Sequence, residues 1–196
     1  MGKCAVSGNI DVVSTSRALI LLELKIVESR MVRLSLLLFA VLLVACEKAP
    51  PVEMPPAQTL TREANGHYCL MTVVYHNGPK GHIILDDKKV YWFTSIRDTI
   101  SFTLSPEEPK NIAAIYVNDM NDANWDNPGL DNWIDARKAW YVLGSNKVGG
   151  MGYAEAVPFS LKEKAELFVT KYGGKIHTFD SIPKEYIMNA TPSESS

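Results

Sequence analysis

Cysteine is scarce in this chain of 196 residues, which contains only Cys4, Cys46 and Cys69. No group of cysteines and histidines shows the spacing of a zinc site. The sequence also lacks a Ser-His-Asp order, a motif of paired acid-base carboxylates and a phosphate-binding loop. The sequence therefore contains no motif that indicates a common class of enzyme.

An excess of charge of one sign is also absent. The chain has 20 basic and 22 acidic residues, for a formal net charge of −2. No run of lysine and arginine alternates with aromatic residues, so nucleic acid is excluded as a partner. The composition, 46% hydrophobic and 21% charged, is that of an ordinary globular protein.

The apolar run near the start is too short to span a membrane. Residues 31–45 begin with a short basic region and continue with about eleven apolar residues, whereas a spanning helix needs roughly 20. This pattern predicts a signal peptide, with a buried core helix as the alternative. The string Leu43-Val44-Ala45-Cys46 fits the bacterial lipobox. We therefore expect cleavage before Cys46, whose thiol carries a diacylglycerol anchor.

Residues 1–30 are an unusual extension before a signal peptide, because they mix charged and apolar residues without a sustained period. We expect Met31 to be the true start. Cys4 is then missing from the mature protein and Cys46 is lipidated, which leaves Cys69 as the free thiol. An unpaired cysteine outside the cytoplasm indicates a reactive or metal-binding sulfur.

A proline-rich segment follows the lipidated cysteine. Residues 46–64 are predicted to form an extended tether that holds the folded part away from the membrane, because of Pro50, Pro51, Pro55 and Pro56. At the other end, the polar residues 186–196 are predicted to be a disordered tail.

The residues between tether and tail predict two small units. In the first, 65–120, a strand is expected from His67 onward, followed by a turn at 77–81. Residues 82–93 predict a strand pair or one long strand. Ser95 then caps a short helix that ends before Pro106, and a strand covers 111–117.

The second unit, 121–185, repeats this order. We expect a strand over 133–143, a glycine-rich turn, a short strand over 153–157, a helix that begins with a capping box at Ser160, and a strand over 175–179. The fold class is therefore α+β, with two small ββαβ-type units in tandem. The repeat rests on the order of elements, since the two halves share little sequence.

The candidate chemistry lies at the start of the first unit. If His67, Cys69 and Met71 lie in a strand, their side chains project to the same face. A thiolate and a thioether are soft ligands that favour copper(I), and zinc rarely accepts a thioether. The alternatives are that Met71 fills the core, that Cys69 is a small buried apolar residue, and that His67 lies on the surface.

Several strings in this chain resemble motifs of the NosL family, whose members are accessory proteins of nitrous-oxide reductase. They are Gly66-His67-Tyr68-Cys69-Leu70-Met71, His76-Asn77-Gly78-Pro79-Lys80, residues 92–98, Val117-Asn118-Asp119-Met120, residues 133–137, Tyr141-Val142-Leu143-Gly144-Ser145 and Gly149-Gly150-Met151-Gly152. The resemblance covers about residues 65 to 180 in order, besides the lipobox.

The resemblance implies a lipoprotein on the periplasmic side of a membrane that carries copper(I) for the copper-sulfide centre of nitrous-oxide reductase. Delivery is expected to involve the membrane maturation machinery of the same pathway. Because Glu47 is not the aspartate associated with inner-membrane retention, the outer membrane is preferred. The lipid anchor is the expected contact with that membrane.

The resemblance also implies that Cys69 and Met71 are copper ligands and that a further ligand comes from elsewhere in the fold. We expect a carboxylate, with Asp135 preferred over Asp119, although both could instead cap loops or pair with nearby basic residues. An enzyme related to organomercurial lyase is the alternative function, but its chemistry is expected to need two cysteines. A purely structural lipoprotein is the third possibility.

Overall fold

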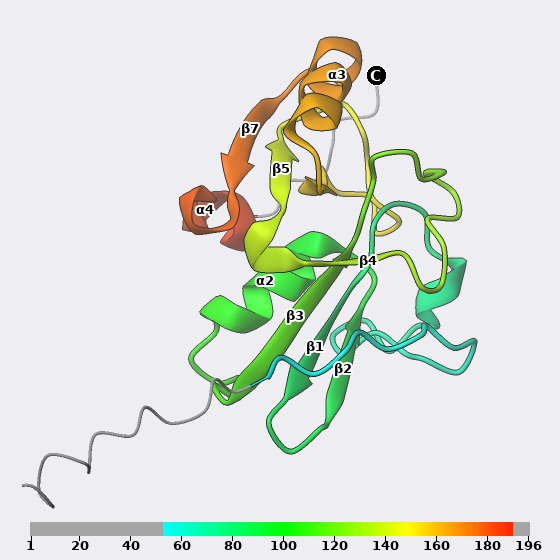
Figure 1. The fold of residues 1–196 in the computed structure, drawn as a ribbon, viewed down its shortest axis with the longest axis vertical. Helices are drawn as coiled ribbons and strands as arrows, with labels where there is room; N and C mark the ends of the chain where they lie inside the picture. The colour runs from blue at the N-terminus through cyan, green and yellow to red at the C-terminus, as the bar shows by residue number, and fades with distance from the viewer. Residues whose placement is uncertain (1–52, 190–196) are drawn as a thin grey trace, which may run out of the picture. The chain divides into compact units, whose positions relative to one another are not determined.

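The computed structural model describes residues 53–189 as an α+β fold with two antiparallel sheets (Figure 1). The predicted extension, the signal peptide, Cys46 and residues 190–196 lie outside the described residues. The strands and helices are β1 (Gly81–Leu85), β2 (Val90–Phe93), α2 (Ile96–Leu104), β3 (Ile112–Asn118), β4 (Trp133–Asp135), β5 (Trp140–Leu143), β6 (Val157–Phe159), α3 (Lys162–Tyr172), β7 (Lys175–Thr178) and α4 (Lys184–Met188). Short 3-10 helices occupy Val73–Tyr75, Ala136–Lys138 and Phe179–Ser181.

The first sheet has the strand order β2-β1-β3-β4, and the second has the order β6-β5-β7. Two strands, a helix and a returning strand therefore occur twice along the chain, as β1-β2-α2-β3 and as β5-β6-α3-β7. The predicted α+β class is confirmed. The alternative of one long strand over residues 82–93 is wrong, because β1 and β2 form an antiparallel hairpin.

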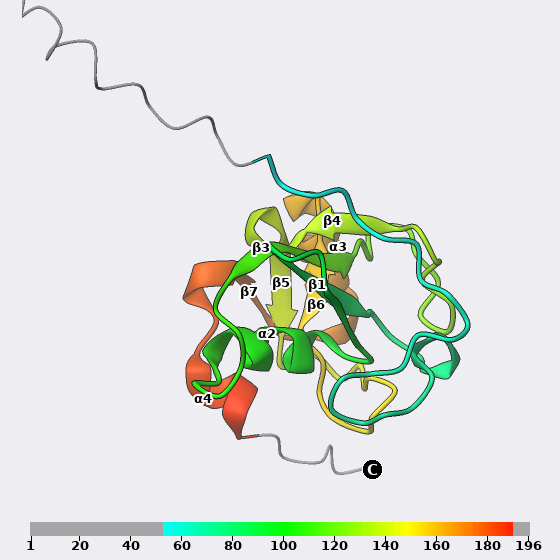
Figure 2. The ribbon, with the colours of Figure 1, turned by 90° about the horizontal axis from the view of Figure 1, so that it is seen from below.

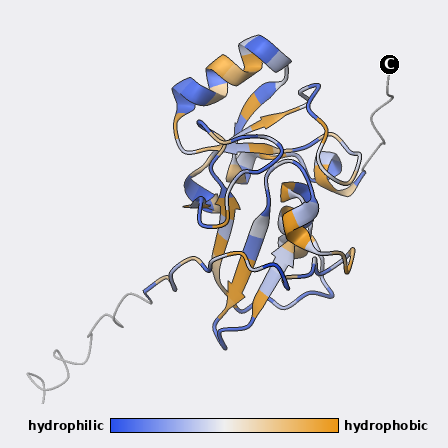
Figure 3. Ribbon diagram, turned by 90° about the vertical axis from the view of Figure 1, so that its right-hand side faces the viewer, coloured by the Kyte–Doolittle hydropathy of each residue, from blue (hydrophilic) through white to orange (hydrophobic). Residues whose placement is uncertain are grey.

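The main core joins the two sheets through α2. Ile83 of the first sheet, Ile96 and Phe102 around α2, and Tyr141 of the second sheet are all fully buried in one cluster. Much of the hydrophobic sequence lies on the strands of the first sheet and on α2 (Figure 3). Each large apolar side chain that is fully buried in this core contributes roughly 1.5–3 kcal/mol to the stability of the fold by leaving water. This shared core fixes the start of α2 relative to both sheets.

The beginning of α2 agrees with the prediction from sequence. Ser95 has an extended backbone, and its hydroxyl oxygen accepts a hydrogen bond from Asp98 N at 3.1 Å. This bond satisfies one of the amide groups that have no partner within the helix. The cap matters for the site described below, because it immediately follows Thr94.

The predicted capping box at the start of α3 does not form. Leu161 occupies the N-cap position and makes no side-chain cap. The hydroxyl of Ser160 instead donates to Asp119 Oδ2 at 2.6 Å, and Ser160 N donates to Asp119 Oδ1 at 3.1 Å. Asp119 therefore joins the loop after β3 to the start of α3.

The predicted tether is partly wrong, because its second half packs on the first sheet. The Tyr116 hydroxyl donates to Pro55 O at 2.7 Å, and Gln58 N donates to His82 Nε2 at 3.1 Å. Leu60 of the same segment is buried in a cluster with Ala64 and Val73. Figure 2 shows this segment running across the molecule before the chain enters the sheet. The physical reason is that an extended, proline-rich chain can still bury apolar side chains and donate from its remaining amides.

His82 holds this segment as a neutral ring. The imidazole is fully buried among Trp92, Tyr116 and Trp133, with ring centroids 4.6, 5.1 and 4.5 Å away. Burial lowers the pKa of His82 to about 3. The uncharged Nε2 can therefore accept the hydrogen bond from Gln58.

Two further expectations are wrong in their details. Residues 133–143 do not form one strand, because the 3-10 helix Ala136–Lys138 separates β4 of the first sheet from β5 of the second. The disordered tail predicted over residues 186–196 is wrong at its start, because residues 186–188 belong to α4 and Ile187 is buried. Its apolar side chain joins the main core. Among the described residues, no helix has the length and hydrophobicity needed to cross a membrane.

Candidate metal site

The predicted donors His67, Cys69 and Met71 lie in a closed loop rather than in a strand. In this donor loop, residues 66–71, Gly66 N donates to Met71 O at 2.8 Å and Leu70 N donates to Gly66 O at 2.8 Å. Leu70 has a φ of 58°, in the left-handed region that costs an ordinary residue about 1 kcal/mol or more. The strand predicted from His67 is wrong, and side-chain alternation no longer groups the three donors.

The donor loop is attached to the edge of the first sheet. His67 N donates to Trp92 O at 2.7 Å, and Gly66 forms a parallel bridge with Trp92 of β2. These contacts give the loop a fixed position beside the end of β2. The aromatic and β-branched composition that suggested a strand is used for this attachment and for packing.

The sulfur of Cys69 lies between Gly66 and Thr94. Its Sγ atom is 3.6 Å from Thr94 Oγ1. A Cβ atom added to Gly66 would come within 2.6 Å of the same sulfur, so glycine is required for this close approach. Cys69 is partly buried and is a free thiol. A partly exposed thiol in a fixed position can bind a soft metal ion.

Met71 and its neighbour Leu70 lie at the surface. The exposed fractions are 43% for Met71 and 78% for Leu70. Met71 is therefore not a core residue, which removes the main alternative to a ligand role. A thioether at this position can be reached by a metal ion from solvent or from a partner protein.

His67 makes a different set of contacts. Its Nε2 atom lies 2.9 Å from Glu108 Oε1, and its ring packs at 4.7 Å from Tyr91 and 5.4 Å from Phe102. The His67 ring thus packs among aromatic side chains beside α2. The His67 side chain is paired with Glu108, whereas Cys69 contacts Thr94.

The predicted carboxylates are not brought to the donor loop. Asp135 lies in β4, and the order β2-β1-β3-β4 places it at the opposite edge of the sheet from β2. Neighbouring strands are about 4.8 Å apart, so these two edges are separated by roughly 14 Å. Asp135 caps Ala136–Lys138 by accepting from Arg137 N, and it pairs with Lys138 at 3.4 Å. Asp119 is engaged with Ser160, as described above.

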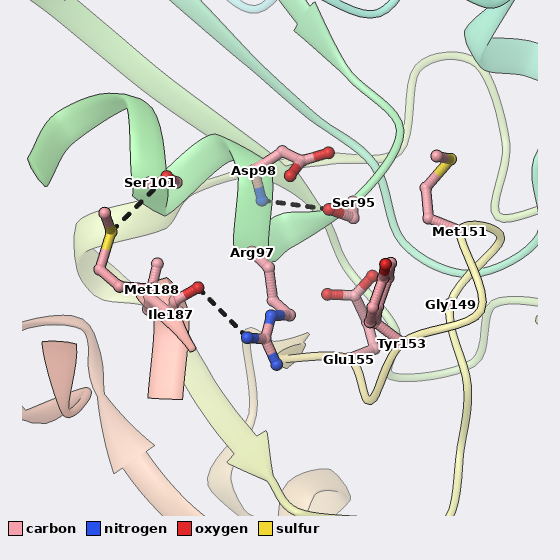
Figure 4. A pocket seen from close by; sticks show the side chains of 10 residues that line it. All are labelled: Ser95, Arg97, Asp98, Ser101, Gly149, Met151, Tyr153, Glu155, Ile187 and Met188. Carbon is pink, nitrogen blue, oxygen red and sulfur yellow. Dashed lines mark hydrogen bonds between the residues drawn. The ribbon is translucent and has the colours of Figure 1, made fainter. Parts of the chain in front are cut away.

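A cavity of about 290 Å³ lies at the start of α2 (Figure 4). Its lining includes Ser95, which directly follows Thr94, and Asp98 in the first turn of α2. From the second half of the chain come Met151 and Glu155. The cavity therefore lies where the start of α2 meets the glycine-rich loop.

Glu155 connects these two segments inside the cavity wall. Its Oε1 atom accepts from Ile96 N at 3.2 Å and from Ala156 N at 2.9 Å. Burial, with a further contribution from Asp98, raises the pKa of Glu155 to about 8. Burial likewise raises the pKa of Asp98. The cavity wall thus contains two carboxyl groups that hold their protons more strongly than usual.

Met151 is a soft donor that reasoning from the sequence did not single out. Its loop is fixed to the segment that follows the donor loop, because Gly150 N donates to Asn77 O at 3.0 Å. A Cβ atom on Gly150 would come within 2.7 Å of His76 Cβ, so the two segments are in close contact. The Gly-Gly-Met-Gly string was the available signal, since it carries a methionine in an irregular loop.

The donor types fit copper(I) better than zinc. Among the described residues, no group of three or more His, Cys, Asp and Glu side chains is arranged to hold a metal ion. Zinc sites usually need four ligands of these kinds. A thiolate and a thioether suit copper(I), which accepts few ligands, and the thiol must lose its proton to bind.

Comparison with known proteins identifies the family. The family model for NosL matches residues 56–187. The chain belongs to the NosL family. It is 42% identical over 156 residues to the copper-binding lipoprotein NosL of Achromobacter cycloclastes, covering 78% of this chain and 79% of that protein. It is 31% identical over 124 residues to the copper-binding lipoprotein NosL of Stutzerimonas stutzeri, covering 63% of this chain and 64% of that protein.

A solved NosL structure has the same fold. The crystal structure of the copper chaperone NosL from Shewanella denitrificans is 38% identical, with a TM-score of 0.61, and covers 69% of this chain and 98% of that chain. The α+β prediction and the resemblance inferred from sequence motifs are thus both confirmed. The role of each residue in the donor loop is a separate question.

Proposed function

We propose that this chain binds one copper(I) ion as cargo, through the Cys69 thiolate and the Met71 thioether. It then delivers the ion for assembly of the copper-sulfide centre of nitrous-oxide reductase. The observation that carries this proposal is the donor loop itself, which places a free thiol and an exposed thioether two residues apart in a closed loop of a NosL-family chain. We expect no catalytic activity, because the metal ion is carried rather than transformed.

The names of the relatives support copper as the cargo. Two relatives are described as copper-binding lipoproteins, and the solved Shewanella denitrificans protein as a copper chaperone. The donor chemistry adds the oxidation state, since thiolate and thioether ligands favour copper(I). The expected recipient is nitrous-oxide reductase, reached through its membrane maturation machinery.

The exposure of the donors suits a carrier more than a permanent metal site. A permanent site surrounds its ion, whereas Met71 is 43% exposed. An ion with two or three ligands at a surface can accept a ligand from a partner before its first ligands leave. The exposed side of the donor loop is therefore where we expect transfer to occur.

We infer that Met151 is the further ligand from the second half of the chain, in place of the predicted Asp135. Met151 lines the cavity at the start of α2, where the lining residue Ser95 follows Thr94 in sequence, and its loop is bonded to the segment that follows Met71. Asp135 caps a 3-10 helix at the far edge of the first sheet. A second thioether also matches copper(I) better than a carboxylate does.

We further propose that lipidation at Cys46 anchors the protein to a membrane on its periplasmic side, with the outer membrane preferred. The lipobox supports this anchor, and the relatives are described as lipoproteins. Cys46→Ala should release the protein from membranes, because a single thiol carries the lipid. The measurement is fractionation of cell envelopes. A Cys46→Ala protein that has been processed by another peptidase and is still found entirely with the membranes would contradict the anchor.

The copper proposal is tested by competitive titration with copper(I) under anaerobic conditions. The purified full-length protein in detergent is titrated against a chromophoric copper(I) chelator. We expect one tight site per chain, and we expect zinc at equal concentration not to displace the copper(I). Two or more tight sites, or displacement by zinc, would contradict the proposed donor set.

A further inference from the structure

We propose that Glu108 is a positioning residue for copper binding. Its carboxylate holds the side chain of His67, and this keeps the donor loop in the conformation that presents Cys69 and Met71 before copper arrives. The inference rests on the proposed function, because it assigns a role in the same site. It also gives His67 a role other than that of a ligand.

Glu108 contacts the side chain of a residue two positions before Cys69. Its Oε1 atom lies 2.9 Å from His67 Nε2. The His67 ring in turn packs on the Tyr68 ring, with centroids 4.7 Å apart. The carboxylate therefore fixes the first side chain of the donor loop.

The Glu108 carboxylate is itself well fixed. It lies in the turn after α2, where Glu108 N donates to Ser105 O at 3.4 Å, and it stands between Glu107 and Pro109. The side chains of His67 and Glu108 are only 27% and 16% exposed. A charged hydrogen bond in such a partly buried setting is stronger than one on an open surface.

The donor loop needs support because its backbone is unfavourable at one position. Leu70 lies between the two ligands with a φ of 58°, and its side chain is 78% exposed, so packing of the leucine does not hold this conformation. A residue in the left-handed region persists where the surroundings determine it. The surroundings are the two hydrogen bonds that close the loop and the contact of Glu108 with His67.

The consequence for copper follows from preorganisation. If the loop is already closed, copper binding does not have to order it, and the affinity is higher. Without Glu108, the free protein would sample open loop conformations, and the first cost of binding would be closing the loop. The Glu108 side chain is not part of the main core, so the rest of the fold should be retained without it.

The test compares four variants of the full-length protein in detergent. Glu108→Ala removes the carboxylate, whereas Glu108→Gln keeps an oxygen that can accept from His67. Glu107→Ala is the matched control, since Glu107 has the same charge and bonds to Ser105 rather than to the loop. His67→Phe keeps an aromatic ring and removes the nitrogen that bonds to Glu108. Each variant is measured by competitive copper(I) titration and by amide hydrogen exchange of the copper-free protein.

We expect Glu108→Ala to lower the copper(I) affinity about threefold to tenfold, as loss of one net hydrogen bond to a charged group implies. Exchange at the amides of Gly66 and Leu70, which close the loop, should become faster by a similar factor. Glu108→Gln should retain most of the wild-type affinity and slow exchange, and Glu107→Ala should leave both unchanged. His67→Phe should speed the exchange of the copper-free protein in the same way and serves if Glu108→Ala does not fold.

A folded Glu108→Ala protein with wild-type affinity, or with unchanged exchange at Gly66 and Leu70, would overturn the inference. Equal losses in Glu107→Ala would also overturn it, because the effect would then come from charge alone. If the wild-type protein does not bind copper(I), the proposed function fails. The exchange measurement would still decide whether Glu108 holds the loop.

Discussion

The sulfur of Cys69 lies 3.6 Å from the hydroxyl oxygen of Thr94, a residue that is only 1% exposed. A hydroxyl can either donate or accept, but a thiolate can only accept. If Cys69 binds copper(I) as a thiolate, as proposed, Thr94 must therefore be the donor. The contact would then hold the sulfur in one place.

We expect Thr94→Val to weaken copper(I) binding about threefold to tenfold, because it removes one hydrogen bond to the sulfur and keeps the shape of the side chain. Thr94→Ser keeps the hydroxyl and should retain most of the affinity. Thr103→Val is the control, since the Thr103 hydroxyl donates to Ile100 O within α2. Competitive copper(I) titration measures all three variants. Wild-type affinity in a folded Thr94→Val protein would exclude this role.

The second prediction concerns the further ligand. Met151→Leu keeps the volume and the apolar character but removes the sulfur, so it should weaken copper(I) binding about tenfold or more without changing the fold. Asp135→Asn should have little effect, because Asp135 lies at the far edge of the sheet. Met188→Leu controls for the loss of a methionine elsewhere in the cavity lining. The measurement is copper(I) affinity, with circular dichroism to confirm folding.

A larger loss of affinity in Asp135→Asn than in Met151→Leu would reverse this assignment. It would mean that the carboxylate predicted from sequence reaches the ion in a conformation that differs from the one described here.

The third prediction is a dependence of stability on pH that comes from Glu155. In the folded protein its pKa is raised to about 8, whereas the ordinary value is 4.5. Between these values the folded state holds a proton that the unfolded chain has lost, so the free energy of unfolding should fall as the pH rises. The contribution is at most about 1.4 kcal/mol per pH unit. Below about pH 4.5 and above about pH 8 it should level off.

Glu155→Gln is uncharged at every pH and should flatten this part of the stability profile. Urea unfolding between pH 5 and pH 8 measures the slope for both proteins. Glu166→Gln, at an exposed position on α3, is the control and should keep the wild-type slope. Identical slopes in wild-type and Glu155→Gln would show that Glu155 is ionised throughout the range.

Local signals in the sequence predicted some of the regular elements, whereas the short strand predicted over 153–157 lies instead at Val157–Phe159. The hydrogen bond between the Ser95 side chain and Asp98 N was foreseen from the residue types and their spacing, and α2 extends over Ile96–Leu104 as expected. The β1-β2 hairpin and the glycines after α3 also follow from local chemistry. Such features depend on residues within a few positions of one another, so one stretch of sequence contains the information.

The donor loop could not be predicted in the same way. Its composition favours a strand, but its hydrogen bonds close on itself and on Trp92, and Leu70 adopts a conformation that leucine rarely takes. Likewise, Ser160 bonds with Asp119 instead of capping α3. In each case a partner that is distant in sequence decides the outcome. Cys69 and Met71 were chosen for their chemistry, and that choice stays a prediction.

The most direct test of the proposed function is the copper(I) affinity of Cys69→Ser beside the wild-type protein and Met71→Leu. All three are titrated anaerobically against the same chelator. We predict one copper(I) per wild-type chain, no tight binding by Cys69→Ser and weaker binding by Met71→Leu, because a neutral hydroxyl is neither soft nor charged and leucine has no donor. A folded Cys69→Ser protein that binds copper(I) as tightly as the wild type would contradict the copper-carrier function proposed for this chain.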